Sequence, residues 1–432
     1  MPIYQVSLWP SVACRRPDSS QNLCSFVVEA AGTQDPKLQC RLNQYFDSMS
    51  AENDVDVVVQ SPNYLKILVE SASKLGIVND PRFRVALYAD EEQIATQLTS
   101  ILDSEVDSAI VLNLRSAEAQ YFLDAIQTIL DKGFLIRHDQ SAQAHKMIQQ
   151  LSAISDEFPP SLFLSNIMRH DERPTFGGPF FNVYKATYHR KTVALKVMRI
   201  FLRGSDLHRF RLLFCQQALI WQHLCHRNVL CFIGIDRESF APSIGMVSPW
   251  MEHGNVLQYL NEHGRGNVNN IVGLLDIANG LQYIHSSGIV HGDLRGANVL
   301  IDDEPKACIA DFGLTQLSDF SLKHGGERAG SLHWMAPELI DPDSFGVQPL
   351  PSFASDVYAF GCVCVELYTG QPPFTNISDV KVISMIMAGR HPEWPFSTNP
   401  IMTNALWQLV IECRGRDYAA RPAIEDIVQR LS

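Results

Sequence analysis

The chain has 432 residues, of which 46% are hydrophobic and 19% are charged. These proportions are typical of a soluble globular protein, and the length is enough for two or three domains. No apolar run approaches the ~20 residues of a membrane span, and the N-terminal stretch lacks the leading positive charge of a signal peptide. The net charge is -12, and residues 1–160 hold 12 basic and 21 acidic side chains. This acidic balance argues against nucleic acid or an anionic membrane as a partner of that part.

The ten cysteines are scattered along the chain, and Cys362 and Cys364 form the only close pair. Their spacing suits neither a zinc site nor a thioredoxin-type redox pair. We therefore expect reduced, mostly buried thiols in an intracellular, cytoplasmic protein.

Residues 1–155 are expected to form a mainly helical module. The early apolar runs 24–30 and 55–60 could each form a short strand. Four later stretches have helical periodicity; they begin near Ser61, Asp90, Ser116 and Ser141, and the first and third end at Gly76 and Gly133. The apolar runs 84–89 and 109–114 are either strands between these helices or continuations of them, because periodicity does not distinguish the two at this length.

No chemical motif is visible in this module, so we expect it to bind a protein partner or to dock on the rest of the chain. The segment 156–160, which reads DEFPP, contains two prolines that end the fourth helix. Since proline also restricts the residue before it, this segment is the expected boundary.

In the next hundred residues, two apolar segments indicate strands. One apolar strand covers Val193, Ala194 and Leu195 and ends at Lys196, and residues 245–251 begin as another strand. A lysine at the end of an apolar strand is commonly a snorkelling side chain, so this segment alone carries no function.

The most informative stretch is 289–301, which reads IVHGDLRGANVLI. Its polar loop holds Asp293 and, five residues later, Asn298, and Asp311 begins the tripeptide DFG further on. An acid, an amide and a second acid at this spacing are what metal-assisted phosphoryl transfer requires. Asp293 can accept the proton of an attacking hydroxyl, whereas Asn298 and Asp311 can supply oxygen ligands to Mg²⁺. The alternative is an ordinary polar loop followed by a helix-capping aspartate.

Together these residues resemble the protein kinase signature H-R-D-x-x-x-x-N followed by D-F-G. The resemblance covers roughly residues 165–432. It implies an α+β, two-lobed protein kinase fold, with a β-rich small lobe over residues 161–252 and a helical large lobe over residues 253–432. The small lobe should contain a five-stranded sheet and one helix, which the resemblance places over residues 206–224.

The resemblance also implies ATP bound between the lobes together with Mg²⁺ or Mn²⁺. Residues 176–185 stand at the Gly-rich loop, in which Phe176 and Phe181 replace two of the three glycines. Ser248 stands at the gatekeeper position, and Pro249 needs only its carbonyl to bind adenine. The implied ATP-binding residues are Gly178, Val183, Ala194, Lys196, Ser248, Pro249 and Met251.

Two departures from the kinase pattern concern the charges around the site. The family's glutamate that pins the strand lysine falls on Gln217, and no acidic residue occurs between Asp206 and Asp236. A neutral hydrogen bond is about half as strong as a charge-assisted one, so we expect weaker orientation of Lys196. The family's arginine before the catalytic aspartate is Gly292. Phosphorylation of the activation segment is therefore not expected to be the main switch; its candidate hydroxyls belong to Thr315, Ser318 and Ser321.

Later landmarks distinguish protein kinases from the small-molecule phosphotransferases that share H-G-D-x-x-x-x-N. These are the tripeptide APE ending in Glu338, the helix 356–361, and Arg421, which should pair with Glu338. The run 330–335 resembles serine/threonine kinases, whereas the loop 294–297 resembles tyrosine kinases.

We expect a protein serine/threonine kinase acting on a protein substrate. In it Asp293 is the base, Lys196 holds the phosphates and Arg295 stabilises the γ-phosphate. The alternatives are a pseudokinase that binds ATP weakly or without turnover and a small-molecule phosphotransferase.

Overall fold

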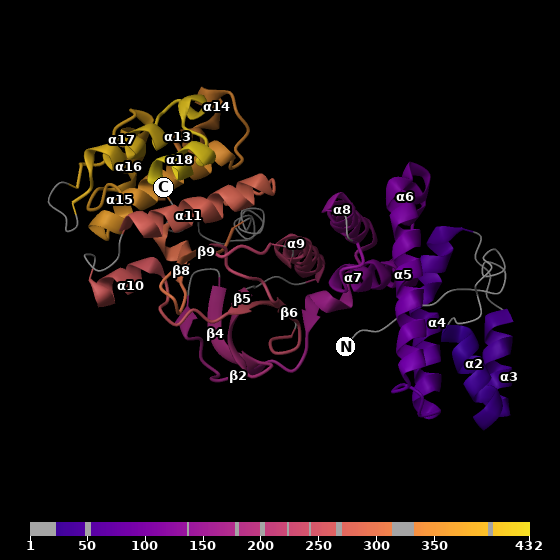
Figure 1. The fold of residues 1–432 in the computed structure, drawn as a ribbon. Helices are drawn as coiled ribbons and strands as arrows, with labels where there is room; N and C mark the ends of the chain where they lie inside the picture. The colour runs from indigo at the N-terminus through magenta and orange to yellow at the C-terminus, as the bar shows by residue number, and fades with distance from the viewer. Residues whose placement is uncertain are drawn as a thin grey trace. The chain divides into compact units, whose positions relative to one another are not determined.

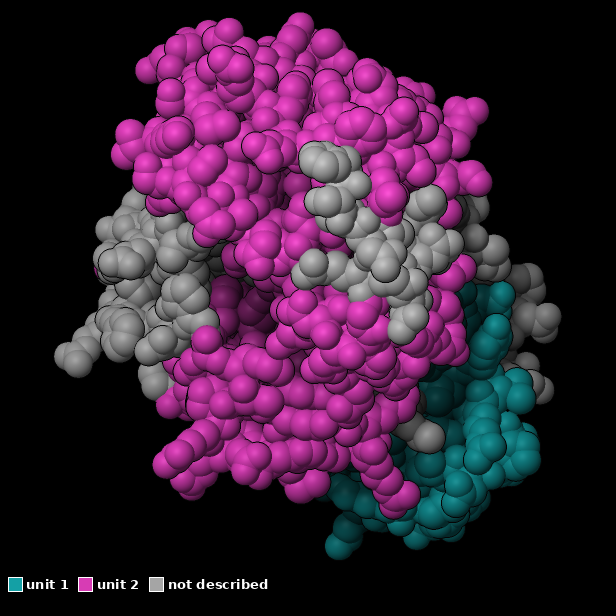
Figure 2. Space-filling model, turned by 90° about the vertical axis from the view of Figure 1, so that its left-hand side faces the viewer, with its two compact units in different colours: residues 1–163 teal, residues 164–432 magenta. Residues whose placement is uncertain are grey.

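The structure is a computed structural model of the chain. It describes residues 23–47, 53–135, 138–177, 181–198, 204–222, 224–241, 243–264, 270–312, 332–395 and 401–432. The chain divides into two compact units, residues 1–163 and residues 164–432, which are coloured separately in Figure 2.

The described part of the first unit is helical, as expected. Its helices are α2 (Leu23–Gln34), α3 (Pro36–Asp47), α4 (Asp54–Lys74), α5 (Pro81–Asp103), α6 (Glu105–Val111), α7 (Ser116–Asp131) and α8 (His138–Ser155), followed by the short η2 (Pro160–Leu162). One core of this unit joins α2, α3, α4 and α5, with Tyr64, Leu68 and Phe83 among its buried side chains. This unit therefore has a hydrophobic core of its own.

The two early strands are wrong, because both apolar runs are helical. Residues 24–30 lie in α2, and residues 55–60 form the first turns of α4. Asn53 caps α4 by accepting a hydrogen bond from the backbone N–H of Asp56, and the valines of this run are almost completely buried. Tertiary burial thus overrides the β preference of valine. Pro62, expected at the start of a helix, lies inside α4.

The remaining helix boundaries are partly as expected. Helix α7 begins at Ser116, and Gly133 follows it with a positive φ of 71°. Helix α5 begins well before Asp90, since Asp80 caps it and Pro81 occupies its first turn. The run 84–89 is consequently a helix continuation, and so is the first part of 109–114, which ends α6.

A sheet begins at the unit boundary, and all of it except Phe163 belongs to the second unit. Its strands are β1 (Phe163–Leu164), β2 (Met168–Arg169), β3 (Phe176–Gly177), β4 (Phe181–Tyr188), β5 (Lys191–Met198), β6 (Gly234–Asp236) and β7 (Gly245–Pro249). The order is β1-β6-β7-β5-β4-β2, with β3 paired to β4. The sheet exceeds the expected five strands because residues 163–177 contribute three two-residue strands. Its helix is α9 (Gly204–Gln222).

Helices dominate the rest of this unit. They are α10 (Val256–His263), α11 (Asn270–Ser286), α13 (Pro337–Ile340), α14 (Pro342–Phe345), α15 (Phe353–Thr369), α16 (Asp379–Met387), α17 (Asn404–Cys413) and α18 (Ile424–Leu431). Short 3-10 turns are η3 (Gly296–Asn298), η4 (Leu332–Trp334) and η5 (Tyr418–Ala420), and β8 (Val299–Ile301) pairs with β9 (Ala307–Ile309).

Figure 1 shows β2, β4 and β5 at one end of this unit and helices α11 to α18 at the other, with β8 and β9 between them. This is the expected two-lobed arrangement. Every residue of α15 from Ser355 to Tyr368 is buried, so the helix forms the centre of the large lobe. Within the described residues, no helix is both long and apolar enough to cross a membrane.

Candidate active site

The loop that carries Asp293 is anchored to α15 through its backbone. The Asp356 carboxylate accepts a hydrogen bond from the His291 N–H at 2.7 Å and another from the Gly292 N–H at 2.9 Å. His285 Nε2 lies 2.9 Å from the same carboxylate. Gly292 has a φ of 80°, which a glycine adopts without strain. A buried helix therefore fixes the position of the residue that precedes Asp293.

Asn298 orients Asp293 from the other end of the loop. Its Nδ2 donates to the Asp293 carbonyl at 2.7 Å and to Asp293 Oδ2 at 3.0 Å. Among the described residues no donor contacts Asn298 Oδ1, which leaves an amide oxygen available as a ligand. Arg295 Nε lies 3.5 Å from Asp293 Oδ2, so a cation lies beside the expected base. Glu366 of α15 holds the loop further by accepting from the Gly296 N–H at 2.8 Å.

The second acid comes from the segment after β9. Asp311 has a φ of 63°, an unusual conformation for a residue other than glycine, and its Oδ2 lies 2.5 Å from Lys196 Nζ of β5. The side chains of both residues are largely enclosed. This ion pair joins the sheet of the small lobe to the strands of the large lobe.

Aromatic rings connect α9 to this segment. The Trp221 ring lies 6.3 Å from that of Phe312 and 5.9 Å from that of Phe232, and Phe312 lies 6.3 Å from His291. His291 is completely enclosed, and this burial lowers its pKa, so its ring is neutral at pH 7. Sequence reasoning missed Trp221, although it lies one helical turn after Gln217 on the same face of α9.

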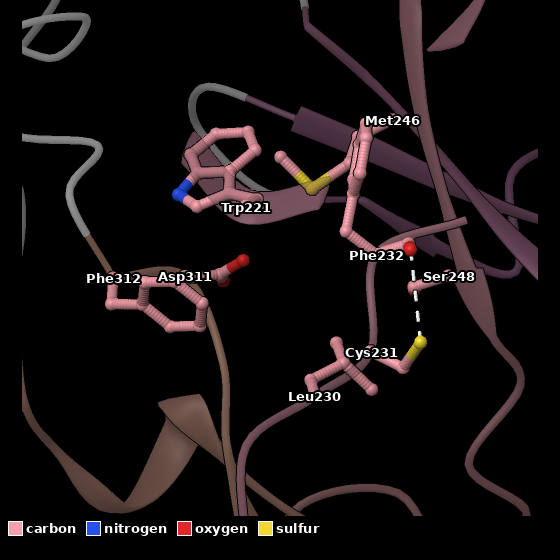
Figure 3. Close-up of a pocket in the computed structure, with 8 residues that line it drawn as sticks. All are labelled: Trp221, Leu230, Cys231, Phe232, Met246, Ser248, Asp311 and Phe312. Atoms are coloured by element: carbon pink, nitrogen blue, oxygen red, sulfur yellow. Dashed lines mark hydrogen bonds between the residues drawn. The ribbon is translucent and has the colours of Figure 1, made fainter. Parts of the chain in front are cut away.

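An open pocket lies beside these rings. Its lining residues are Trp221, Leu230, Cys231, Phe232, Met246, Ser248, Asp311 and Phe312. Figure 3 shows the Asp311 carboxylate pointing into the space that the other side chains surround. Most of the wall is apolar, as is common for a ligand site, and the Asp311 carboxylate and the Ser248 hydroxyl are among its few polar groups.

The residues expected to bind ATP lie mostly on three neighbouring strands. Val183 on β4 is opposite Lys196 on β5, and Ala194 on β5 is opposite Ser248 on β7. Pro249 ends β7, and the half-buried Met251 follows two residues later. The sheet thus brings these expected residues together, but Gly178 lies outside the described residues. Lys196 Nζ also lies 4.4 Å from the centroid of the Phe181 ring.

The predicted partnership between Glu338 and Arg421 is confirmed. Two parallel hydrogen bonds join them at 2.6 and 2.7 Å, and both side chains are almost completely buried. Arg421 also donates to the backbone carbonyls of Gly415 and Ala354. Such a bidentate pair fixes α13, which follows the activation segment, against the C-terminal part of the chain.

Comparison with known proteins agrees with this geometry. The family model of protein tyrosine and serine/threonine kinases matches residues 175–431. Serine/threonine-protein kinase STY17 of Arabidopsis thaliana is 28% identical over 264 residues, which are 60% of this chain and 44% of that protein.

Two further relatives come from the same plant. Serine/threonine-protein kinase STY46 is 30% identical over 259 residues, and serine/threonine/tyrosine-protein kinase HT1 is 29% identical over 259 residues. Each match covers 59% of this chain, but 42% of the former protein and 63% of the latter. The chain therefore spans less than two thirds of the length of these relatives.

Proposed function

The chain belongs to the protein tyrosine and serine/threonine kinase family, and from this premise we propose that it transfers the γ-phosphoryl group of ATP to serine or threonine hydroxyls of proteins. One observation carries the proposal. The amide of Asn298 holds Asp293, Lys196 pairs with Asp311, and the Ala310 N–H donates to the Asn298 carbonyl at 2.8 Å. These contacts support one shared site for the proposed base, cation and oxygen ligands. Phosphoryl transfer depends on such positioning more than on covalent chemistry.

Each side chain then has a defined task. Asp293 accepts the proton of the substrate hydroxyl, and Asn298 keeps the carboxylate oriented for that transfer. Lys196 binds the α- and β-phosphates, and Arg295 balances the charge of the transferred group. The adenine would lie against Val183, Ala194, Ser248, Pro249 and Met251, a placement supported by the pairing of Val183 with Lys196 and of Ala194 with Ser248.

The donor set fits a magnesium ion. Among the described residues no cluster of three or more His, Cys, Asp or Glu side chains could hold a metal by itself. Asn298 Oδ1 and the Asp311 carboxylate provide two hard oxygen ligands, and Mg²⁺ sites in such enzymes combine one or two protein ligands with phosphates and water. When bound, Mg²⁺ or Mn²⁺ would neutralise the charge of the phosphate oxygens.

Two observations support serine or threonine as the acceptor. STY17 and STY46 are named serine/threonine kinases, and Trp334 and Met335 continue the run 330–335 that resembles that class. Gly330 and Ser331, which begin the run, lie outside the described residues. HT1 is named as a serine/threonine/tyrosine kinase, so the product must be identified by phosphoamino-acid analysis.

A pseudokinase is the second candidate, and Gln217 favours it. Helix α9 carries Asp206 as its only acidic residue, about three turns before Gln217. Within the described helix, Gln217 therefore offers Lys196 no charged partner. A protein that binds ATP without turnover would explain why the glutamate is dispensable.

The two candidates are separated by transfer of phosphate from labelled ATP to the chain itself and to a generic protein, with Mg²⁺ and with Mn²⁺. We expect transfer by the unchanged protein and its loss in Asp293→Asn and in Lys196→Met. Asp303→Asn makes the same chemical change at an exposed position and serves as the control. Stabilisation by ATP without any transfer would replace the kinase proposal with the pseudokinase. Turnover on small alcohols alone would instead favour a small-molecule phosphotransferase.

We further propose that residues 1–155 bind a protein partner or the kinase unit, in a cytoplasmic protein. The separate core of the first unit and the absence of disulfides among the described cysteines support this. Deleting residues 1–155 should change either the unfolding temperature of the kinase unit or the set of proteins that purify with it. If neither changes, this role is wrong.

A further inference from the structure

Lys196 has no acidic partner on α9. Gln217 lies one turn before Trp221, whose ring contacts Phe312, so Gln217 is on the helix face that points toward the site. Its amide is neutral, and the only acid of the helix, Asp206, is about 16 Å away along the axis. Lys196 therefore needs a charged or aromatic partner from outside α9 if it is to be held as firmly as by a carboxylate.

The first such group is Asp311, at 2.5 Å from Lys196 Nζ. In the proposed reaction this carboxylate is also a metal ligand, and a carboxylate shared with Mg²⁺ holds an ammonium less firmly. A partner of Lys196 that binds neither the metal nor the phosphates would stay in contact with the ammonium throughout the reaction.

The second group is the ring of Phe181, whose centroid lies 4.4 Å from Lys196 Nζ. The register of the sheet explains the contact. Val183 is directly opposite Lys196, and Phe181 lies two residues earlier on the same side of β4. A diagonal neighbour of this kind is within reach of aromatic and long side chains.

We propose that Phe181 is a positioning residue that replaces the missing glutamate of α9. The negative face of its ring attracts the ammonium, and the attraction strengthens where water is excluded. The Lys196 side chain is only 17% exposed, so part of that strengthening applies here. Glycine, which the family has at this position, offers no such contact. Phe181 in place of the family's glycine thus compensates for Gln217 in place of the family's glutamate.

This inference rests on the proposed kinase function, and a double-mutant cycle tests it. The variants are Phe181→Leu, Phe181→Tyr, Gln217→Glu and the double variant Phe181→Leu with Gln217→Glu. Steady-state transfer gives kcat and the KM for ATP of each full-length protein. Phe176→Leu is the matched control, because Phe176 lies on the same loop but stacks on Trp250 at 6.0 Å.

We expect Phe181→Leu to lower kcat by about 2- to 30-fold, which corresponds to a cation–π contact of ~0.5 to 2 kcal/mol. Phe181→Tyr should retain the rate because it keeps the ring. Gln217→Glu should restore most of the loss in the leucine variant and have a smaller effect in the unchanged protein. The effect of Phe176→Leu should not depend on residue 217.

A second measurement does not need turnover. Competitive acetylation of Lys196 by acetic anhydride, read by peptide mass spectrometry, reports how well the amine is covered. We expect faster acetylation in Phe181→Leu, but not in Phe181→Tyr or Phe176→Leu. If the unchanged protein transfers no phosphate but acetylation follows this pattern, the kinase proposal fails while the contact stands.

Two results would overturn the inference. A lower KM for ATP in Phe181→Leu, with an unchanged or higher kcat, would mean that the ring obstructs the phosphates. Equal effects of Gln217→Glu with and without Phe181 would mean that the two positions are independent, since compensating residues must couple.

Discussion

Asp356 acts on the site without touching the reacting atoms. Its carboxylate receives two backbone N–H groups of the loop that carries Asp293, and it is almost completely buried. Hydrogen bonds to a charged acceptor are each worth about 1.5 to 3 kcal/mol. A substitution that keeps the shape of Asp356 but removes its charge therefore tests its hydrogen bonds to the loop without changing how the side chain packs.

Asp356→Asn should destabilise the protein by about 2 to 3 kcal/mol and lower kcat strongly. The amide keeps one acceptor oxygen, but its NH₂ group would face a backbone N–H that now donates to the other oxygen. Urea unfolding and steady-state phosphate transfer measure the two effects. Asp343→Asn, at an exposed position of α14, is the matched control. A normal rate in Asp356→Asn would show that the loop holds its geometry without these bonds.

Asp124 of α7 is a residue whose charge opposes folding. Burial raises its pKa to about 6, and the hydrogen bond from Gln120 Nε2 at 2.7 Å offsets only part of that cost. In an unfolded chain the pKa is about 3.9. Between these values the folded protein binds more protons than the unfolded chain, so stability falls as the pH rises through this window.

Asp124→Asn should therefore stabilise the protein at pH 7 and leave it unchanged at pH 4. We expect about 1 kcal/mol at pH 7, since partial exposure reduces the effect. Hydrogen exchange of α7 peptides at both pH values checks this in the full chain. Asp107→Asn in the first turn of α6 provides a half-buried comparison. A gain that persists at pH 4 would have to come from packing, and the ionisation argument would be wrong.

At the scale of elements, the bidentate pair between Glu338 and Arg421 fixes α13 against the C-terminal segment. Both side chains lie in the interior, so truncating one leaves the other charge buried without a counterion. Arg421→Met should destabilise the kinase unit by about 3 to 5 kcal/mol.

Replacing both partners should cost less than replacing Arg421 alone, because no uncompensated charge remains. Urea unfolding of Arg421→Met and of Arg421→Met with Glu338→Leu makes this comparison. Arg430→Met removes an arginine from a half-exposed ion pair with Glu412 and should have a small effect. Equal losses in the single and double variants would contradict the buried-charge explanation.

Local signals predicted some elements well and others poorly. Helix α7 could be placed because a serine start and a glycine stop enclose an amphipathic run. Residues 55–60 were expected to form a strand because valine prefers β structure. They are helical because their side chains are buried when α4 packs. Helix α5 was placed too late, although Asp80 and Pro81 carry an ordinary start signal.

In the candidate site, too, some contacts could be predicted from local sequence and others could not. Asp293 and Asn298 lie close together in sequence, so their hydrogen bond could be expected from the spacing. The contact between Phe181 and Lys196 depends on the register of β4 and β5, which no single segment specifies. Glu366 was missed because it is an inward-facing residue of a wholly buried helix, with no polar pattern around it.

At the scale of the whole molecule, the chain consists of two units with separate cores. A single two-state transition is therefore not the expectation for its unfolding. A ligand that binds one folded unit stabilises that unit by about 2.7 kcal/mol at one hundred times its dissociation constant. If nucleotide binds only the second unit, the two cores should respond differently to ATP.

We expect calorimetry of the full chain to show two transitions, of which ATP with Mg²⁺ raises only one. Hydrogen exchange assigns them, because peptides of β4, β5 and α9 should gain protection while those of α4 and α5 should not. Lys196→Met should reduce the shift by removing a phosphate contact, and Asp303→Asn should keep it. Protection that extends into α4 and α5 would mean that nucleotide binding couples the units. The helical unit would then regulate the kinase directly, and its deletion should change the affinity for ATP.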